Sequence, residues 1–144
     1  MTGLYALAVL TADDRLDILG LVAAAAQALD RLDGPGFASM FTDDGVLVAG
    51  AEQDWGSAQL TDLVLRAARA GTVLRRHVQT TTMEELSDGF ARALSYVLVS
   101  KVMPGSRIGI SASGVYDDEM TRTPVGWRIS RRTVTTDGAV NVMV

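Results

Sequence analysis

The single histidine of the chain, His77, and the aspartate Asp30 are the residues whose types most directly suggest chemistry. Histidine titrates close to neutral pH, so its side chain can both take up and release a proton. Asp30 continues an apolar stripe of the first predicted helix, four residues after Ala26, where packing does not explain a carboxylate. A carboxylate bonded to one ring nitrogen would orient the imidazole and raise the basicity of the other nitrogen. Such a pair could remove a proton beside a carbonyl group or protonate a leaving hydroxyl group.

Each of the two residues also has a simpler structural interpretation. A lone histidine can be a partly buried residue that only makes hydrogen bonds, and an aspartate near a helix end can be solvated. The catalytic hypothesis therefore requires that Asp30 and His77 meet inside one apolar cavity.

The composition limits the kinds of function that are possible. The chain has 144 residues, no cysteine, one histidine and a formal net charge of −4. Without cysteine there are no disulfides or thiolate metal sites, and one histidine excludes a multi-histidine metal site within one chain. The negative charge argues against a nucleic-acid partner, because binding phosphates needs a basic surface. We expect chemistry that needs neither a metal nor a cofactor.

The apolar stretches of the chain are short. Residues 1–10 contain no basic residue, and the apolar run at 19–26 is too short for a transmembrane helix, so we expect no signal peptide and no membrane partner. The length suits one domain over residues 1–144, with a core at 12–134. We expect a cytoplasmic protein.

The first half of the chain predicts helices. Apolar residues recur at helical spacing over 12–32, and Thr11 is suited to cap this helix. A second amphipathic helix is predicted over 58–70 and ends at Gly71. A helical turn, a short strand and a loop are expected between the two helices, at 37–41, 46–49 and 50–56.

From Thr72 onward the apolar pattern changes to a period of two, which is typical of strands. Four long strands are predicted near 73–86, 90–103, 106–120 and 126–135. Asp88-Gly89 suits a two-residue hairpin turn between the first two of these strands. Helices followed by such strands predict an α+β domain, with the helices on one face of a curved antiparallel sheet.

The Asp88-Gly89 turn predicts a register for the first long hairpin if the strands contain no bulge. The register places four pairs on one face: His77–Ser100, Gln79–Leu98, Thr81–Tyr96 and Met83–Leu94. A mostly apolar face with a few polar groups is typical of the wall of a small-molecule pocket. We therefore predict that substrate contacts Gln79, Tyr96, Leu98 and Ser100.

Two further aromatic residues are candidates for the same site. Tyr116, like Tyr96, could donate a hydrogen bond to a developing enolate oxygen, or it could fill the core. Trp55 lies in the loop expected over the cavity mouth, where it could act as a lid or as simple cover.

Six short motifs occur in a fixed order along the chain. They are Ala28-Leu29-Asp30-Arg31-Leu32-Asp33, Met40-Phe41-Thr42-Asp43-Asp44-Gly45, Arg75-Arg76-His77, Gly89-Phe90-Ala91-Arg92-Ala93-Leu94-Ser95-Tyr96, Gly114-Val115-Tyr116-Asp117-Asp118 and Gly126-Trp127-Arg128-Ile129-Ser130-Arg131-Arg132. In this order the chain resembles the SnoaL-like group of the NTF2-like superfamily over residues 12 to 134. The resemblance implies a cone of curved sheet, closed by helices around a cavity.

The resemblance also implies roles for individual residues. In dehydratases of the superfamily, a Tyr-Asp pair near the end of the first helix and a histidine at the start of the first long strand line the cavity. Asp30 and His77 match that aspartate and that histidine, whereas Leu29 stands in the place of the tyrosine. A second cavity histidine of those enzymes falls near Ser100. The superfamily includes polyketide cyclases, a ketosteroid isomerase, epoxide hydrolases and non-catalytic subunits, so the fold alone does not define the function.

Three functions remain open at this point. The first is a cofactor-free lyase or isomerase with an Asp30–His77 pair, acting on a hydrophobic small molecule as a polyketide-type cyclase, dehydratase or isomerase. The second is a non-catalytic ligand-binding or assembly module. The third is an epoxide hydrolase, which needs an Asp-Arg-Asp arrangement around a water molecule, and no arginine partner for Asp30 inside the cavity is evident. We expect a homodimer.

Overall fold

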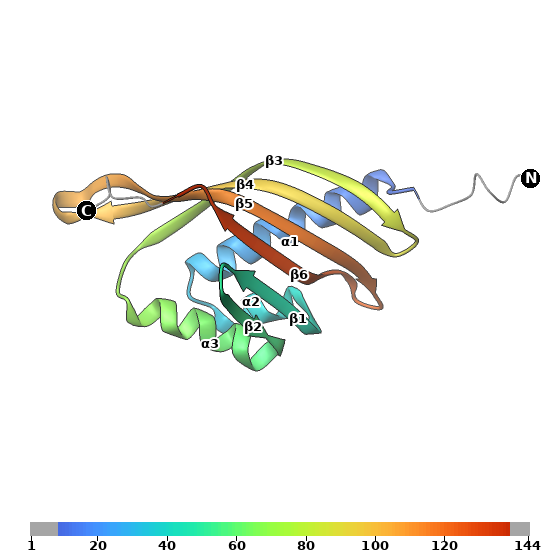
Figure 1. Ribbon diagram of the computed structural model, residues 1–144, viewed down its shortest axis with the longest axis horizontal. Coiled ribbons are helices and arrows are strands. Elements are labelled where there is room, and N and C mark those ends of the chain that lie inside the picture. The colour runs from blue at the N-terminus through green and yellow to red at the C-terminus, as the bar shows by residue number, and fades with distance from the viewer. Residues whose placement is uncertain (1–8, 139–144) are drawn as a thin grey trace, which may run out of the picture.

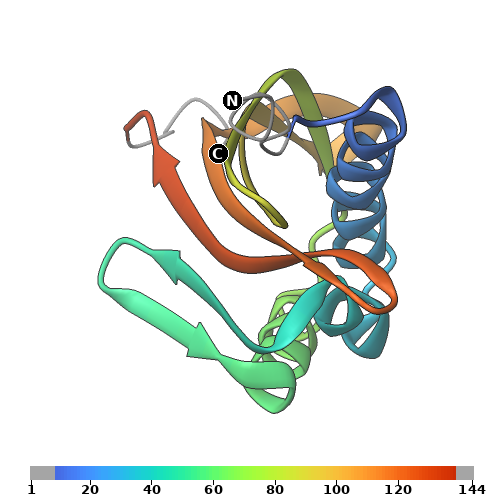
Figure 2. The ribbon, with the colours of Figure 1, turned by 90° about the vertical axis from the view of Figure 1, so that its right-hand side faces the viewer.

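The computed structural model describes residues 9–138 as a strongly curved six-stranded sheet with helices against one face (Figures 1 and 2). Its elements are α1 (Ala12–Asp30), α2 (Gly34–Ser39), β1 (Phe41–Ala49), β2 (Glu52–Trp55), α3 (Gly56–Arg69), β3 (Leu74–Ser87), β4 (Phe90–Met103), the 3-10 turn η2 (Pro104–Ser106), β5 (Arg107–Thr123) and β6 (Gly126–Thr136). The strand order is β2-β1-β6-β5-β4-β3, and among residues 9–138 only β1 and β6 pair in parallel. The predicted α+β class is confirmed. Most of the opening segment 1–10 lies outside the described residues.

Helix α1 begins at a capping box and runs across the concave side of the sheet. The Thr11 hydroxyl accepts a hydrogen bond from the Asp14 N–H at 3.0 Å, and the Asp14 carboxylate accepts one from the Thr11 N–H at 3.0 Å. These bonds satisfy N–H groups that a helix start would leave without partners. Ile18, Val22 and Ala25 of the predicted apolar stripe are buried, whereas Leu32, predicted to end it, lies after the helix and is exposed. The helix ends at Asp30, which is thereby placed beside the start of β3.

The main core fills the space between the helices and the sheet. It contains Ile18 and Leu21 of α1, Phe37 of α2, Leu60 of α3 and Ile129 of β6, together with neighbouring apolar residues. A second, smaller cluster lies on the strands beyond this core. Its buried members are Val97, Val99 and Tyr116, and its partly buried members are Leu74, Val78, Ala112 and Val134. We call the side of β3–β6 that faces α1 the inner face, and the opposite side the outer face.

The register predicted for the β3–β4 hairpin is wrong, because β3 contains two bulges. Ser87 pairs with Phe90 as expected, but Leu86 is an extra residue between that pair and Glu85–Ala91. Farther along, Thr80 and Thr81 together face the single residue Ser95, and Thr80 has a φ of 54°. Each bulge shifts the pairing by one residue. As a result, His77 lies opposite Leu98, Gln79 opposite Tyr96, and Arg75 opposite Ser100.

The bulge at Thr80 also exchanges the faces of β3. On the hairpin side of the bulge, Thr81 and Met83 point inward; beyond it, Arg76 and Val78 do. His77 lies between the last two and is exposed on the outer face. The predicted set of side chains sharing one face is therefore divided between the two faces.

The β1–β2 region differs from the prediction because its structure depends on distant partners. β1 begins at Phe41 instead of Val46, and its second half pairs in parallel with β6. Residues predicted as a loop form β2, which pairs with β1 around Gly50. Within residues 9–138, no helix has the length and apolar character needed to cross a membrane.

Candidate functional site

Asp30 and Arg76 form an ion pair where α1 meets the inner face of the sheet. Asp30 Oδ1 accepts a hydrogen bond from Arg76 Nη1 at 2.6 Å, and Asp30 Oδ2 accepts one from the Arg76 backbone N–H at 3.0 Å. The two side chains are 17% and 14% exposed, respectively. The carboxylate is therefore held in one orientation, yet it still reaches solvent.

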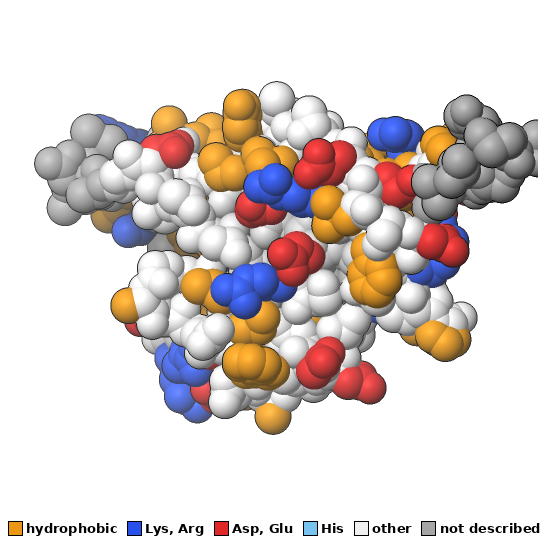
Figure 3. Space-filling view, turned by 45° about the vertical axis from the view of Figure 1, so that its right-hand side comes forward, with side chains coloured by type: hydrophobic (Ala, Val, Ile, Leu, Met, Phe, Trp, Pro, Cys, Tyr) orange, Lys and Arg blue, Asp and Glu red, His pale blue; other side chains and the backbone are white. Residues whose placement is uncertain are grey.

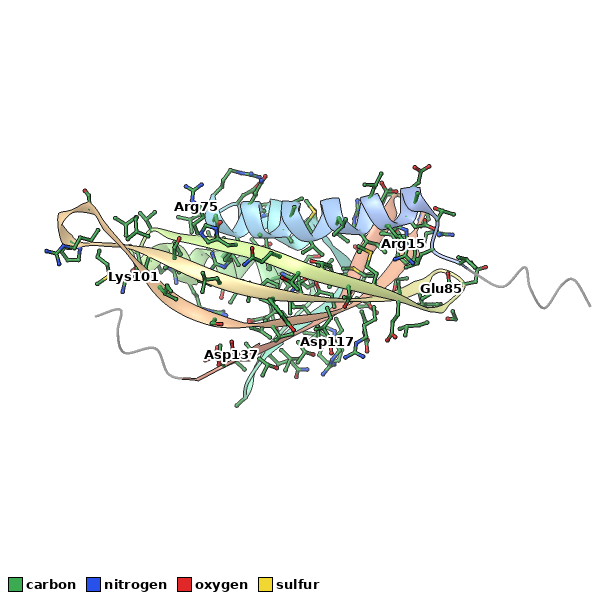
Figure 4. All side chains as sticks on the ribbon, turned by 90° about the horizontal axis from the view of Figure 1, so that it is seen from above. Arg15, Arg75, Glu85, Lys101, Asp117 and Asp137 are labelled. Carbon is green, nitrogen blue, oxygen red and sulfur yellow. The ribbon has the colours of Figure 1, made fainter. Side chains whose placement is uncertain are left out.

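A tight turn after Asp30 connects α1 to α2. Leu32 adopts a positive φ of 60°, which turns the chain sharply. Asp33 then caps α2 by accepting a hydrogen bond from the Gly36 N–H at 2.9 Å. Figure 4 shows Arg75, the neighbour of Arg76, at this end of α1.

A crevice of about 100 Å³ opens beside the Asp30–Arg76 pair. Its other lining residues are Leu29, Leu32, Ala67, Thr72, Val73 and Leu74, which come from the end of α1 and the turn after it, from α3, and from the segment that leads into β3. The lining is thus largely apolar, and the ion pair forms its charged edge. Ligand pockets commonly have volumes of about 300–1,000 Å³, so this crevice fits one end of a ligand.

The predicted pairing of His77 with Asp30 is absent. His77 Nε2 lies 3.1 Å from Ser100 Oγ on the outer face, whereas Asp30 bonds to Arg76 on the inner face. Among residues 9–138, no hydrogen bond or ion pair joins Asp30 to His77. The physical reason is the bulge at Thr80, which turns Arg76 toward α1 and His77 away from it.

The outer face gathers most of the residues predicted to contact substrate. Gln79 pairs with Tyr96, and His77 pairs with Leu98. Tyr96 is 54% exposed, and Ser100 bonds to His77. Figure 3 shows acidic, basic and hydrophobic side chains intermixed on this side of the molecule. These residues lie together, but on the opposite side of the sheet from Asp30.

Trp55 is not placed over the crevice. It is the last residue of β2 and the residue before α3, and it is 57% exposed. The crevice residue Ala67 lies near the other end of α3, about 18 Å along the helix at 1.5 Å per residue. The expectation of a lid or cover at the cavity mouth is therefore wrong, because the predicted loop is a hairpin strand.

Tyr116 is the one predicted aromatic residue that lies on the inner face. It is 6% exposed, and the guanidinium of Arg132 lies 4.2 Å from the centre of its ring. Its hydroxyl makes no hydrogen bond to any other residue of the range 9–138. Tyr116 also belongs to the smaller apolar cluster, which includes the crevice residue Leu74.

A buried ion pair lies next to Tyr116 and was not predicted as part of the site. Arg132 Nε and Nη2 donate to the two carboxylate oxygens of Asp118 at 2.7 and 2.8 Å. Burial alone would lower the pKa of Arg132, but the Asp118 carboxylate raises it above its usual range. The available sequence signal is that Asp118 alternates with Tyr116 and Met120, which places all three on one face.

The two carboxylates of the inner side differ in what they can do. Arg132 donates to both oxygens of Asp118, and Asp118 is fully buried. This pair therefore has a structural role inside the domain. Asp30 is partly exposed beside a crevice and is the carboxylate that a ligand can approach. Within residues 9–138, no group of three or more His, Asp or Glu residues could hold a metal ion.

The whole site lies within a segment that matches a known family model. The model of the SnoaL-like domain matches residues 10–133. The chain belongs to the SnoaL-like domain family. No curated protein matches this SnoaL-like chain.

Solved structures agree with the SnoaL-like assignment. An NTF2-like protein with a cystatin-like fold from Novosphingobium aromaticivorans is 21% identical, with a TM-score of 0.80, over 91% of this chain and 86% of that one. ActVI-ORFA from Streptomyces coelicolor is 26% identical, with a TM-score of 0.78, over 85% and 97%. A Catenulispora acidiphila protein in complex with S-DNPA is 21% identical, with a TM-score of 0.78, over 88% and 96%. The predicted NTF2-like fold is thereby confirmed.

Proposed function

We propose that this SnoaL-like protein is a cofactor-free acid–base enzyme that acts on a hydrophobic small molecule. The reaction class is a polyketide-type cyclisation, dehydration or double-bond isomerisation. The observation that carries the proposal is Asp30, a partly exposed carboxylate fixed by two hydrogen bonds at the charged edge of an apolar crevice. Support for a small-molecule ligand comes from the similar Catenulispora acidiphila protein, which was solved with S-DNPA.

In this proposal Asp30 acts without His77. The carboxylate takes a proton from a carbon next to a carbonyl group and later returns it to the product. Tyr116 lies on the inner face but does not line the crevice, so its role as a hydrogen-bond donor to a substrate oxygen stays a prediction. The apolar residues of the crevice, among them Leu29, Leu32 and Leu74, would hold the hydrocarbon part of the substrate.

The experiment is proton exchange, because it requires only the first chemical step. The protein is incubated with 1-tetralone in D₂O, and NMR follows deuterium entering beside the carbonyl group. We expect Asp30→Asn to lower the catalysed rate by about 10²–10⁴. Asp17→Asn removes the same charge from an exposed position of α1 and should keep the wild-type rate. An Asp30→Asn protein that exchanges as fast as wild type would refute the proposal.

One observation favours a second candidate, hydrolysis of an epoxide. The expectation that Asp30 has no arginine partner is wrong, since Arg76 lies 2.6 Å away. An Asp–Arg pair could hold a water molecule and polarise an epoxide oxygen. Conversion of styrene oxide to its diol in H₂¹⁸O, measured by mass spectrometry, tests this reaction.

The non-catalytic module stays a prediction, as do the homodimer and the cytoplasmic location. A ligand that co-purifies with a protein inactive in both assays would favour the binding module. Light scattering measures the oligomeric state.

A further inference from the structure

The guanidinium of Arg76 has donors that Asp30 does not use. An arginine side chain carries five N–H donors. Asp30 engages Nη1, whereas Nε and Nη2 make no hydrogen bond to another residue of the range 9–138. That range contains no fully buried side-chain nitrogen without a partner, so these two nitrogens reach accessible space. Arg76 lines the crevice, which places its donors beside any ligand bound there.

The charge balance of the crevice selects a class of ligand. The Asp30 carboxylate and the Arg76 guanidinium neutralise each other in a place that is largely covered by apolar side chains. A ligand that arrives with its own carboxylate or phosphate would add an unbalanced charge next to Asp30, at a cost in desolvation and repulsion. An uncharged carbonyl oxygen can accept a hydrogen bond from Arg76 and leave the net charge at zero.

We propose, building on the acid–base function above, that Arg76 is a second catalytic residue and that the substrate is an uncharged, enolisable ketone. Asp30 takes a proton from the carbon next to the carbonyl group, so that a C–H bond breaks and an O–H bond forms. The electron pair of the C–H bond becomes the enolate double bond, and the carbonyl π pair moves to oxygen. Arg76 donates hydrogen bonds to that oxygen.

The arrangement keeps Arg76 neutralised throughout the step. Before proton transfer its partner is the Asp30 carboxylate; afterwards its partner is the enolate oxygen, because Asp30 is then a neutral acid. One negative charge moves a short distance past a fixed positive charge, and the net charge of the crevice stays constant. Donors fixed in advance near a developing oxyanion stabilise the transition state without having to reorganise.

The test uses Asp30→Asn, which gives the crevice the charge it would have after proton transfer. The probes are 2,4-dinitro-1-naphthol, which is an anion at pH 7 and stands in for the enolate, and neutral 2-naphthol. Binding is titrated by fluorescence and calorimetry. We expect Asp30→Asn to bind the anion about tenfold more tightly than wild type does, or about 1.4 kcal/mol. We expect neutral 2-naphthol to bind both proteins equally.

Further variants separate Arg76 from its surroundings. The double variant Asp30→Asn with Arg76→Gln should lose the gain in anion affinity. The double variant Asp30→Asn with Arg76→Lys should keep part of that gain. The matched control, Arg75→Gln, removes the same charge from the next residue on the outer face and should leave the gain intact. The proposal fails if the Asp30→Asn gain is absent, or if it survives Arg76→Gln. It also fails if Arg75→Gln abolishes the gain.

The binding assay and the exchange assay fail independently. A wild-type protein that exchanges no protons refutes the proposed function even if anion binding follows Arg76. A protein that exchanges protons through Asp30 but shows no Arg76-dependent anion binding refutes only the role of Arg76. Circular dichroism of each variant confirms that it is folded. If the Arg76→Gln variant does not fold, the Arg76→Lys variant replaces it in the comparison of anion affinities.

Discussion

Arg132 of β6 donates two parallel hydrogen bonds to Asp118 of β5, and neither side chain is more than 2% exposed. This fork holds two adjacent strands together at the centre of the inner face. The guanidinium also covers the ring of Tyr116, so the ion pair fixes the position of that residue. The pair therefore links the stability of the sheet to the shape of the proposed site.

Breaking this buried pair should be costly. Arg132→Met leaves the Asp118 carboxylate buried without its partner, and we expect a loss of about 3–5 kcal/mol in the free energy of unfolding. The double variant with Asp118→Leu removes both charges and should lose much less. Urea unfolding at pH 7 measures these values.

Arg92→Met is the control, because Arg92 pairs with Asp117 in the same fork geometry but is 41% exposed. We expect that control to lose far less, because solvent screens an exposed ion pair. Equal losses for Arg132→Met and Arg92→Met would contradict this interpretation.

The cap of α1 should make the stability of the protein depend on pH in the acidic range. Hydrogen bonds from the Thr11 backbone and from the Trp127 ring lower the pKa of Asp14 from the ordinary 3.8 to about 2. Because the folded pKa lies below the unfolded one, the stabilisation is complete above about pH 4 and is lost as the pH falls toward 2. Asp14→Asn should therefore cost about 1 kcal/mol at pH 7.

The same variant should become indistinguishable from wild type near pH 2. Urea unfolding at pH values from 7 to 2 checks this convergence. Asp13→Asn, in the same helical turn, serves as control. At neutral pH its free energy of unfolding should differ less from that of wild type than does the free energy of Asp14→Asn. If the difference in the free energy of unfolding between Asp14→Asn and wild type stays constant with pH, Asp14 does not have the capping role.

Substitution of two different glycines by alanine should change the stability of the protein in opposite directions. Gly20 lies within α1, and a Cβ there would have no atom within 4 Å, so Gly20→Ala should stabilise the protein by about 0.5–1 kcal/mol. Gly114 lies on β5, where a Cβ would overlap the carbonyl oxygen of Thr135. We expect Gly114→Ala to destabilise the protein by about 1–3 kcal/mol. Thermal unfolding of both variants checks the signs, and a Gly114→Ala protein at least as stable as wild type would contradict the close approach of β5 to Thr135 of β6.

His77→Ala tests whether the outer face takes part in catalysis. His77 is exposed and its ring lies within hydrogen-bonding distance of the Ser100 hydroxyl, so the substitution should change the free energy of unfolding by less than about 0.5 kcal/mol. We expect the rate of 1-tetralone exchange to stay at the wild-type level. If the rate instead fell as far as it does in Asp30→Asn, the outer face would have to be part of the site.

Local patterns were enough to predict most of the helices and strands. The N-cap at Thr11, the buried residues Ile18, Val22 and Ala25 of α1 and the Asp88-Gly89 turn each carry a signal within a few residues, and each was confirmed. The parallel pairing of β1 with β6 was not predictable in this way. It joins segments about 85 residues apart along the chain, so it depends on tertiary packing.

The candidate site was harder to predict than the fold. Asp30 lies on the inner side, but the partner predicted for it was His77, whereas the structure pairs it with Arg76. The error comes from Thr80, a β-branched residue with a positive φ, which is a conformation such residues rarely adopt. Nothing in a run of three threonines marks that position as a bulge.

The extra residue at Thr80 also affects how this chain should be compared with its relatives. A protein that lacks one residue at this point would keep an unbroken alternation along the strand, and the residue aligned with His77 would then face the helix. A single insertion or deletion, far from any reacting atom, can thus exchange an arginine for an imidazole beside the same aspartate. Two family members with identical residues at aligned positions could therefore have different sites.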